Sequence, residues 1–217
     1  NIKSRNIFKT VEGKVADGDQ NNLKIINISV EERATGEISA GAGVGTDGGL
    51  LAFTIKENNY LGSGKAVTLD FEIDSESLTG ALSFNDPNYD FLGNSLYYAL
   101  ASETNDKPDQ GYENSLTSFS IGTGFEQYRN VDLNLGLSAS YDDLRTDSSA
   151  SSNLKKQEGT YSDISANYGF NYDTRDRSFM PTSGSVVNFA QSLPIYADKS
   201  FIANTFQLSG YKSLNED

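Results

Sequence analysis

The amino-acid sequence predicts an all-β protein, an antiparallel meander of strands that span a membrane as part of a β-barrel. Three observations lead to this prediction: apolar and polar side chains alternate along most of the chain, the alternating segments run for about nine to thirteen residues, and turn-forming residues separate them. A period of two is the pattern of a strand with two different faces. Strands of globular proteins are most often about five or six residues long, whereas about nine to eleven tilted residues cross a bilayer.

The clearest alternating segment covers residues 66–74. Its apolar residues Val67, Leu69, Phe71 and Ile73 alternate with Thr68, Asp70, Glu72 and Asp74. The same reading along the chain predicts ten strands, at about 37–45, 50–58, 66–74, 78–86, 95–104, 115–126, 131–143, 161–173, 185–194 and 201–213. Segments rich in Gly, Pro, Asp and Ser lie between them, at 46–49, 61–64, 106–109 and 181–184, and such clusters mark turns.

The lengths of the connections favour a membrane barrel over a soluble fold. A soluble β-sandwich or a lipocalin-like barrel also alternates, with its apolar face in the core. Here we expect tight turns after the second, sixth and eighth strands, and longer polar loops at 105–114 and 144–160 on the opposite side. Short turns at one rim and long loops at the other are typical of outer-membrane barrels.

The composition excludes several classes of function. The chain of 217 residues has no His and no Cys, which removes ordinary zinc sites, a Cys nucleophile and a Ser-His-Asp triad. A net charge of -13 disfavours nucleic-acid binding, because Lys and Arg supply most of that affinity. No run of 18 apolar residues is present, so a helical membrane protein is excluded. We therefore expect no enzyme activity, no cofactor, no metal and no nucleic-acid partner.

The first 35 residues differ from the rest. Residues 4–11 suit the end of a helix running into a strand, residues 22–33 suit a second strand, and residues 17–19 suit the turn between them. This segment is too short for a domain, so we expect the tail of a small α+β module joined to the barrel through residues 33–36. Because the chain begins without Met and stops after a strand-like run, we expect it to be an internal piece of a longer precursor.

Three segments resemble a known family. The segment IFKTV with LKIINISVEERATGEISAGAGVGTDGGL is similar to the junction between the last POTRA domain and the first barrel strand of bacterial outer-membrane assembly factors. ENNYLGSGKAV looks like the first periplasmic hairpin of that family, and YDTRDRSFMPTSGS looks like its Asp-Arg, aromatic and Pro-Thr-x-Gly turn. The resemblance covers nearly the whole chain in order. The family's Val-Arg-Gly-Phe/Tyr motif and its closing strand are absent from this sequence.

The resemblance implies an architecture and partners. Residues 1–35 would be the C-terminal part of the last POTRA domain, in the periplasm, and residues 36–217 would be the first ten of sixteen strands in the outer membrane. The implied partners are unfolded outer-membrane protein clients, accessory lipoproteins of the assembly complex and outer-membrane lipid. Two other functions stay open: a related barrel for two-partner secretion or for translocation and assembly, and a passive porin.

The expected first barrel strand is rich in glycine. Its residues are Ile38, Ser39, Ala40, Gly41, Ala42, Gly43, Val44 and Gly45. Alternate glycines weaken a strand, and a weak strand with unpaired N–H and C=O groups is a template for another chain. The resemblance implies that this strand is a lateral gate that binds client strands by β-augmentation. Alternatively, the small residues accommodate strand coiling or a close neighbour.

A second candidate is the turn that carries the Asp-Arg motif. Its residues are Arg175, Asp176, Arg177, Phe179, Pro181, Thr182 and Gly184. Charge beside a tight turn predicts a structural role, with Pro181 and Gly184 supplying restricted and permissive backbone. The alternative is a polar network that supports the gate or the docking of the POTRA domain.

Three further patterns are better explained by strands and turns. Residues 43–48 match the glycine spacing of a dinucleotide site, but a strand follows where that site needs a helix. Residues 61–66 suggest a phosphate loop, yet they suit a hairpin turn. Asp70, Glu72 and Asp74 lie about 7 Å apart along one strand face, which predicts a hydrated barrel wall rather than a metal site.

Overall fold

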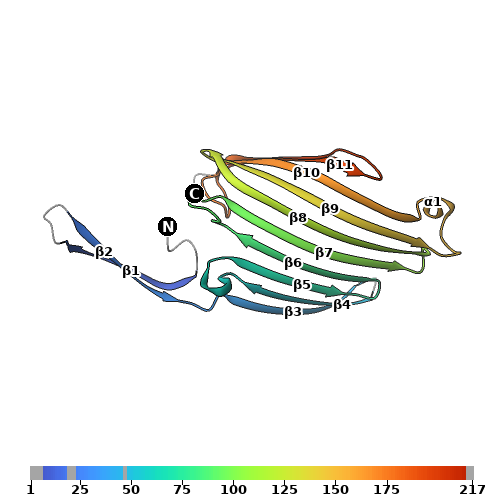
Figure 1. The fold of residues 1–217 in the computed structure, drawn as a ribbon, viewed down its shortest axis with the longest axis horizontal. Coiled ribbons are helices and arrows are strands. Elements are labelled where there is room, and N and C mark those ends of the chain that lie inside the picture. The colour runs from blue at the N-terminus through green and yellow to red at the C-terminus, as the bar shows by residue number, and fades with distance from the viewer. Residues whose placement is uncertain (1–6, 19–22, 46–47, 214–217) are drawn as a thin grey trace.

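The structure, a computed structural model, describes residues 7–18, 23–45 and 48–213, and within them the chain is almost entirely strand. A two-stranded antiparallel sheet precedes a ten-stranded one (Figure 1). The small sheet contains β1 (Phe8–Asp17) and β2 (Lys24–Glu32). The large sheet contains β3 (Gly36–Gly45), β4 (Gly48–Glu57), β5 (Ala66–Ile73), β6 (Ser77–Asp86), β7 (Ser95–Lys107), β8 (Tyr112–Tyr128), β9 (Val131–Thr146), β10 (Gly159–Asp173), β11 (Ser183–Ala197) and β12 (Ala203–Lys212). Within these residues, no helix has the length and apolar character needed to cross a bilayer.

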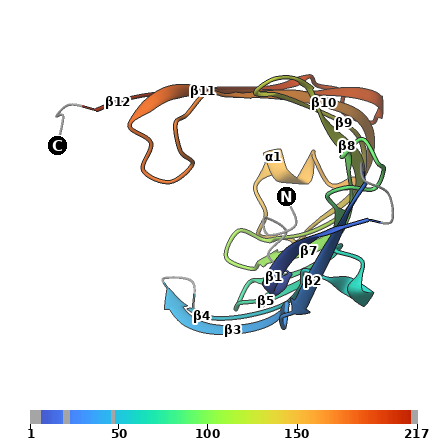
Figure 2. The same cartoon turned by 90° about the vertical axis from the view of Figure 1, so that its left-hand side faces the viewer.

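The ten strands form a meander in which each strand pairs with the strand before it, from β3 at one edge to β12 at the other. The sheet curves into an open trough, and the short helix α1 (Ser152–Lys155) and the connection between β10 and β11 lie on its concave side (Figure 2). The predicted number and order of barrel strands are therefore confirmed. The expected helix end before residue 7 and the predicted turn residues at 19, 46 and 47 lie outside the described residues.

Residues that pair directly across strands lie on the same face of a sheet, so the register shows what each face is made of. One row across the sheet is apolar throughout: Ile38, Ile55, Leu69, Leu82, Leu100, Phe119, Ala139, Ile164 and Tyr196. The neighbouring row on the other face is small or polar throughout: Ser39, Thr54, Asp70, Ala81, Ala101, Ser118, Ser140, Asp163 and Ala197. The alternation in the sequence therefore builds two chemically different faces.

The polar face is the concave one. A hollow beside the helix-bearing loop is lined by Ser140, Asp142, Asp163 and Gln157, and another is lined by Glu126, Asp132, Asn134 and Asn171. The apolar face is convex and open. Among the described residues only Ile7 and Ala150 are apolar and buried, whereas Leu82, Leu100 and Phe119 of the apolar row are nearly half exposed. A convex surface of this kind is suited to lipid rather than water.

The apolar band does not follow the register. On β5 it reaches the last residue, Ile73, but the row through Ile73 continues into Thr104 on β7 and Ser115 on β8. Rows run perpendicular to the strands, and barrel strands tilt against the barrel axis by about 35–45°, so a band parallel to a membrane must cross the rows obliquely. The ends of β7, β8 and β9 are consequently polar on both faces and extend past the band.

The two rims differ from the prediction. The near rim adjoins the β1–β2 hairpin, and its connections are 58–65, 87–94, 129–130 and 174–182; the far rim has 46–47, 74–76, 108–111, 147–158 and 198–202. The predicted long loop at 105–114 is wrong, because Asn105, Asp106 and Lys107 pair with Asn114, Glu113 and Tyr112. The predicted tight turns after the second and eighth strands are also wrong. The tight turn after the sixth strand and a long polar loop near 144–160 are confirmed. Continued backbone pairing lengthened the strands where the side-chain alternation stopped.

Candidate functional site

The glycine-rich segment of the sequence forms β3, an edge strand of the large sheet. All ten of its residues are exposed, and its pairing partner among the described residues is β4 alone. Gly41, Gly43 and Gly45 alternate with Ala40, Ala42 and Val44, so the glycines lie on the concave face with Ser39. One long side of the strand thus presents backbone N–H and C=O groups without a described partner.

No described neighbour requires these glycines. A Cβ atom added at Gly41, Gly43 or Gly45 would meet no atom within 4 Å. This removes one of the two structural alternatives, accommodation of a close neighbour, and leaves strand coiling and a weak, accessible edge. Compared with alanine, glycine in a strand interior is destabilising by about 0.5–1 kcal/mol per residue, so three of them make the far half of β3 easy to deform.

Glycines elsewhere on the concave face have a clear packing role, which the sequence reasoning did not identify. The Tyr97 ring lies over Gly122 and Gly136 of the two next strands. A Cβ at Gly122 would be 2.3 Å from the ring, and one at Gly136 would be 2.9 Å from the Tyr97 hydroxyl. An aromatic residue in register with inward glycines on two adjacent strands is the signal that could have revealed this packing.

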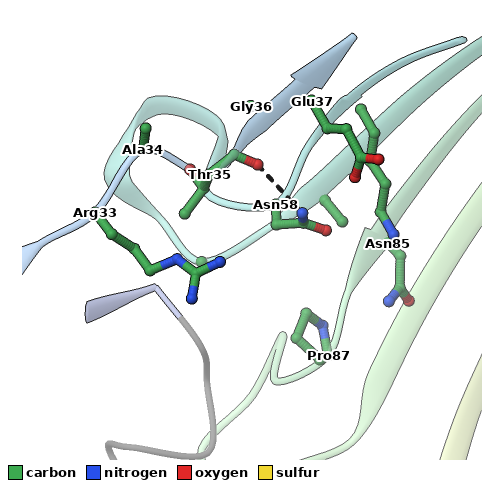
Figure 3. Close-up of a pocket in the computed structure, with 11 residues that line it drawn as sticks. Arg33, Ala34, Thr35, Gly36, Glu37, Asn58, Asn85 and Pro87 are labelled. Carbon is green, nitrogen blue, oxygen red and sulfur yellow. Dashed lines mark hydrogen bonds between the residues drawn. The ribbon is translucent and has the colours of Figure 1, made fainter. Parts of the chain in front are cut away.

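The near end of β3 is held by specific contacts at a polar groove of about 660 Å³, whose lining includes Arg33, Thr35, Glu37, Lys56 and Asn58 (Figure 3). The backbone N–H and the side-chain amide of Asn58 both donate to the Thr35 carbonyl, at 3.4 and 3.2 Å. The Thr35 hydroxyl donates to the Glu57 carboxylate. The edge strand is therefore fixed at its near end and free of side-chain contacts in its glycine-rich half.

The motif at 175–184 forms the near-rim connection between β10 and β11. Each charged residue has a different partner: Arg175 donates to Asp173 at 2.6 Å, Arg177 Nε donates to the Met180 carbonyl at 2.7 Å, and Asp176 accepts from Thr182 and Ser183. The connection turns toward the concave side of the sheet (Figure 2).

Its two special backbone positions behave differently. Gly184 has φ +100°, and a Cβ there would lie 2.3 Å from the Thr174 carbonyl oxygen. Pro181 lies in an exposed stretch with Phe179, which is 80% exposed. The structure thus brings Arg175, Asp176, Arg177, Thr182 and Gly184 into the turn's own scaffold, and it leaves Phe179 at the surface.

Asp176 gives this turn a pH dependence. The Thr182 hydroxyl donates to its carboxylate at 2.6 Å, and the Ser183 and Thr182 N–H groups donate at 3.2 and 3.0 Å. These hydrogen bonds stabilise the charged form and lower the pKa of Asp176 from 3.8 to about 2.

A group whose folded pKa is below its unfolded pKa stabilises the fold above the unfolded value, and that stabilisation is lost as the pH falls through the folded value. We therefore expect the turn to loosen between about pH 4 and about pH 2. Hydrogen exchange of residues 174–185 checks this, and Asp176→Asn should remove the dependence in that range. An unchanged pH profile in Asp176→Asn would contradict the assignment.

Other candidates have structural roles. Asp70 accepts a hydrogen bond from Thr54 at 2.7 Å, and Asp74 accepts the N–H groups of Glu76 and Ser77 in a far-rim turn. Within residues 7–18, 23–45 and 48–213, no three His, Cys, Asp or Glu side chains are placed to hold a metal ion. Residues 61–66 lie in the connection that pairs β4 with β5, and residues 48–57, after the dinucleotide-like spacing, are a strand.

Known proteins share this sequence and fold. BamA, the outer membrane protein assembly factor of Neorickettsia risticii (strain Illinois), is 25% identical over 203 residues, which cover 90% of this chain and 27% of the relative. The assembly factor BamA of Neisseria meningitidis serogroup B is 36% identical over 74 residues, 34% of this chain and 9% of the relative. The crystal structure of BamA from Haemophilus ducreyi lacking POTRA domains 1-3 matches with a TM-score of 0.79 at 24% identity, covering 99% of this chain and 44% of that one.

These comparisons confirm the predicted fold class and the family resemblance. The chain spans about a quarter of the length of the first of these relatives. Residues 59–217, most of the ten-stranded sheet, match the model of the Omp85 superfamily domain. By sequence and by fold, this chain belongs to the Omp85 superfamily.

Proposed function

We propose that this chain is the N-terminal portion of the barrel of an outer-membrane protein assembly factor, which folds and inserts β-barrel proteins into the bacterial outer membrane. The observation that carries the proposal is the edge strand β3, which is exposed along its whole length and paired on one side. The names of the two BamA relatives point to the same activity. The chemistry needs no catalytic group, because strand addition proceeds by backbone hydrogen bonds alone.

The edge strand acts as a lateral gate in this proposal. In lipid an unpaired backbone N–H or C=O group costs several kcal/mol, so a client strand arriving in the membrane gains free energy by pairing with β3. The glycines at 41, 43 and 45 keep the concave side of the strand clear, since no described atom lies within 4 Å of their missing side chains. The client strand is the binding partner, and residues 38–45 are its binding site.

The β1–β2 hairpin fits the expected POTRA segment. On one of its faces Val11 and Val15 pair with Val30 and Ile26, and these side chains are exposed or nearly so. A two-stranded sheet with an apolar face is not stable alone. We infer that residues 1–35 are the C-terminal part of a periplasmic POTRA domain whose remaining elements cover this face. Accessory lipoproteins are proposed as further partners of the complete protein.

Crosslinking tests the gate. A single Cys at Ser39 or Gly41, in the full-length protein and in cells, is expected to form a disulfide with a Cys in a stalled client barrel. Asn134→Cys is the matched control, because Asn134 lies on the same concave face of the central strand β9 and should give no adduct. Absence of adducts at both β3 positions, while clients still assemble, would sink the proposal.

Depletion of the protein separates the alternatives. An assembly factor is expected to cause loss of many outer-membrane barrels, whereas a secretion barrel would affect one exported substrate and spare porins. A passive porin would leave assembly unchanged and give a steady ion conductance. The exposed, weak edge strand favours the first of these outcomes, because a porin gains nothing from such an edge.

A further inference from the structure

The register of β3 against β4 is poorly specified by the strand's own side chains. Its concave positions from 41 to 45 are glycine, and its convex positions 40 and 42 are alanine. Flat, glycine-rich strands are prone to slip, and a one-residue slip moves every side chain to the other face. A two-residue slip keeps the faces but moves every pairing partner by about 7 Å. Something outside the glycine-rich stretch must select the register.

The near-end contacts are specific enough to do so. The Thr35 carbonyl accepts two hydrogen bonds from Asn58, and the Thr35 hydroxyl donates to Glu57. Glu57 pairs with Gly36 in the ladder, and a Cβ on Gly36 would lie 3.1 Å from a Glu57 carboxylate oxygen. The absence of a side chain at position 36 thus gives the carboxylate room beside the strand.

The other side of this contact is itself held in place. Asn59 donates its N–H to Glu57 at 2.7 Å, and its side-chain oxygen accepts the N–H of Gly64 at 2.7 Å. The Tyr60 N–H donates to the Lys65 carbonyl at 2.9 Å. The connection at 58–65 is therefore closed by its own hydrogen bonds, and it presents Glu57 and Asn58 to the start of β3 at a defined height.

We propose that Thr35, Glu57 and Asn58 are the positioning residues of the edge strand: they set the register of β3 against β4, and through it the register in which an added strand pairs with β3. A slip of two residues breaks all three hydrogen bonds at once, although it preserves the apolar and polar faces. The consequence for an added strand rests on the proposed function; the register of β3 itself does not.

Disulfide mapping reads the register directly, because the chain has no native Cys. Ser39 pairs with Thr54, and Lys56 and Ala52 are the concave positions two residues to either side. Directly opposite Cβ atoms lie about 4.5–5.5 Å apart and diagonal ones about 7–8 Å apart. In the full-length protein in its membrane, Ser39→Cys with Thr54→Cys should crosslink efficiently, and Ser39→Cys with Lys56→Cys or Ala52→Cys should not.

Removing the contact should redistribute these products. In Thr35→Val, and in Glu57→Gln combined with Asn58→Ala, we expect the ratio of slipped to in-register product to rise about tenfold, which corresponds to about 1.4 kcal/mol. Thr35→Ser keeps the hydroxyl and should behave as the unaltered protein. Asp74→Asn is the matched control, since Asp74 accepts similar hydrogen bonds in a turn remote from β3.

A reporter on neighbouring strands separates slipping from unfolding. Asp70 and Ala81 pair between β5 and β6, so Asp70→Cys with Ala81→Cys should crosslink in every folded variant. If that reporter persists and the Ser39–Thr54 product is undiminished in the altered proteins, the positioning role is overturned. If the reporter is lost in the double variant, Thr35→Val decides alone. Normal register shifts without client crosslinks at Ser39 would instead contradict the proposed function and leave this inference standing.

Discussion

Gly184→Ala is expected to destabilise the protein by about 2–4 kcal/mol, the combined effect of an unfavourable backbone conformation and an overpacked site. Gly184 has φ +100°, and the added Cβ would lie 2.3 Å from the Thr174 carbonyl oxygen and 2.8 Å from the Arg175 Cα. Both neighbours are backbone atoms, so they cannot move without breaking the pairing of β10 with β11. Urea unfolding of the full-length protein in detergent micelles measures the change.

Gly41→Ala is the control for this substitution. Gly41 also lies in a strand of the large sheet, but its φ is not in the left-handed region and no described atom lies within 4 Å of the new Cβ. We expect no loss of stability, and a gain of about 0.4–1 kcal/mol is compatible with a less flexible unfolded chain. Equal destabilisation by the two substitutions would show that the space at Gly184 is not what limits it.

Leu135→Lys is expected to destabilise the membrane-embedded protein by about 2–4 kcal/mol, the penalty for a lysine at the bilayer midplane. Leu135 lies on the convex face near the middle of the apolar run of β9, opposite Tyr168, and its side chain is 48% exposed. Since no protein atoms cover it, the penalty reports on the medium around the face. Unfolding in lipid bilayers measures it.

Asn134→Lys provides the comparison, because Asn134 is the preceding residue of β9 and lines an open hollow on the concave face. We expect a change of about 0.5 kcal/mol or less, as for an ordinary exposed position. Similar effects at both positions would mean that both faces meet water, and the lipid-facing assignment of the convex face would then be wrong.

Several parts of the fold could be predicted because they depend on local sequence. The alternation in residues such as Leu69 and Asp70 predicts two faces, and the turn residues predict where strands reverse. Within that reading, the ten strands and their order were confirmed. The ends of β7 and β8 were missed because Asn105 and Glu113 carry no apolar alternation, yet their backbones pair with a neighbour.

The candidate site shows the same division. The glycines of β3 and the Asp-Arg turn could be singled out from the sequence, and the roles assigned to β3 stay predictions until crosslinking tests them. The packing of Tyr97 on Gly122 and Gly136 could not be predicted, because it depends on which strands become neighbours and in which register. The contact of Thr35 with Glu57 and Asn58 also joins segments that only the hairpin brings together.

The sequence by itself determined the class of fold, the two faces of the sheet and the absence of His and Cys chemistry. Periodicity and composition are local properties of a chain, so they need no knowledge of neighbours. The tertiary structure decided the lengths of the long strands, the rim connections, the open concave side of β3 and the hydrogen bonds that fix its near end. These depend on backbone pairing and on close approach between strands, and strand register sets both.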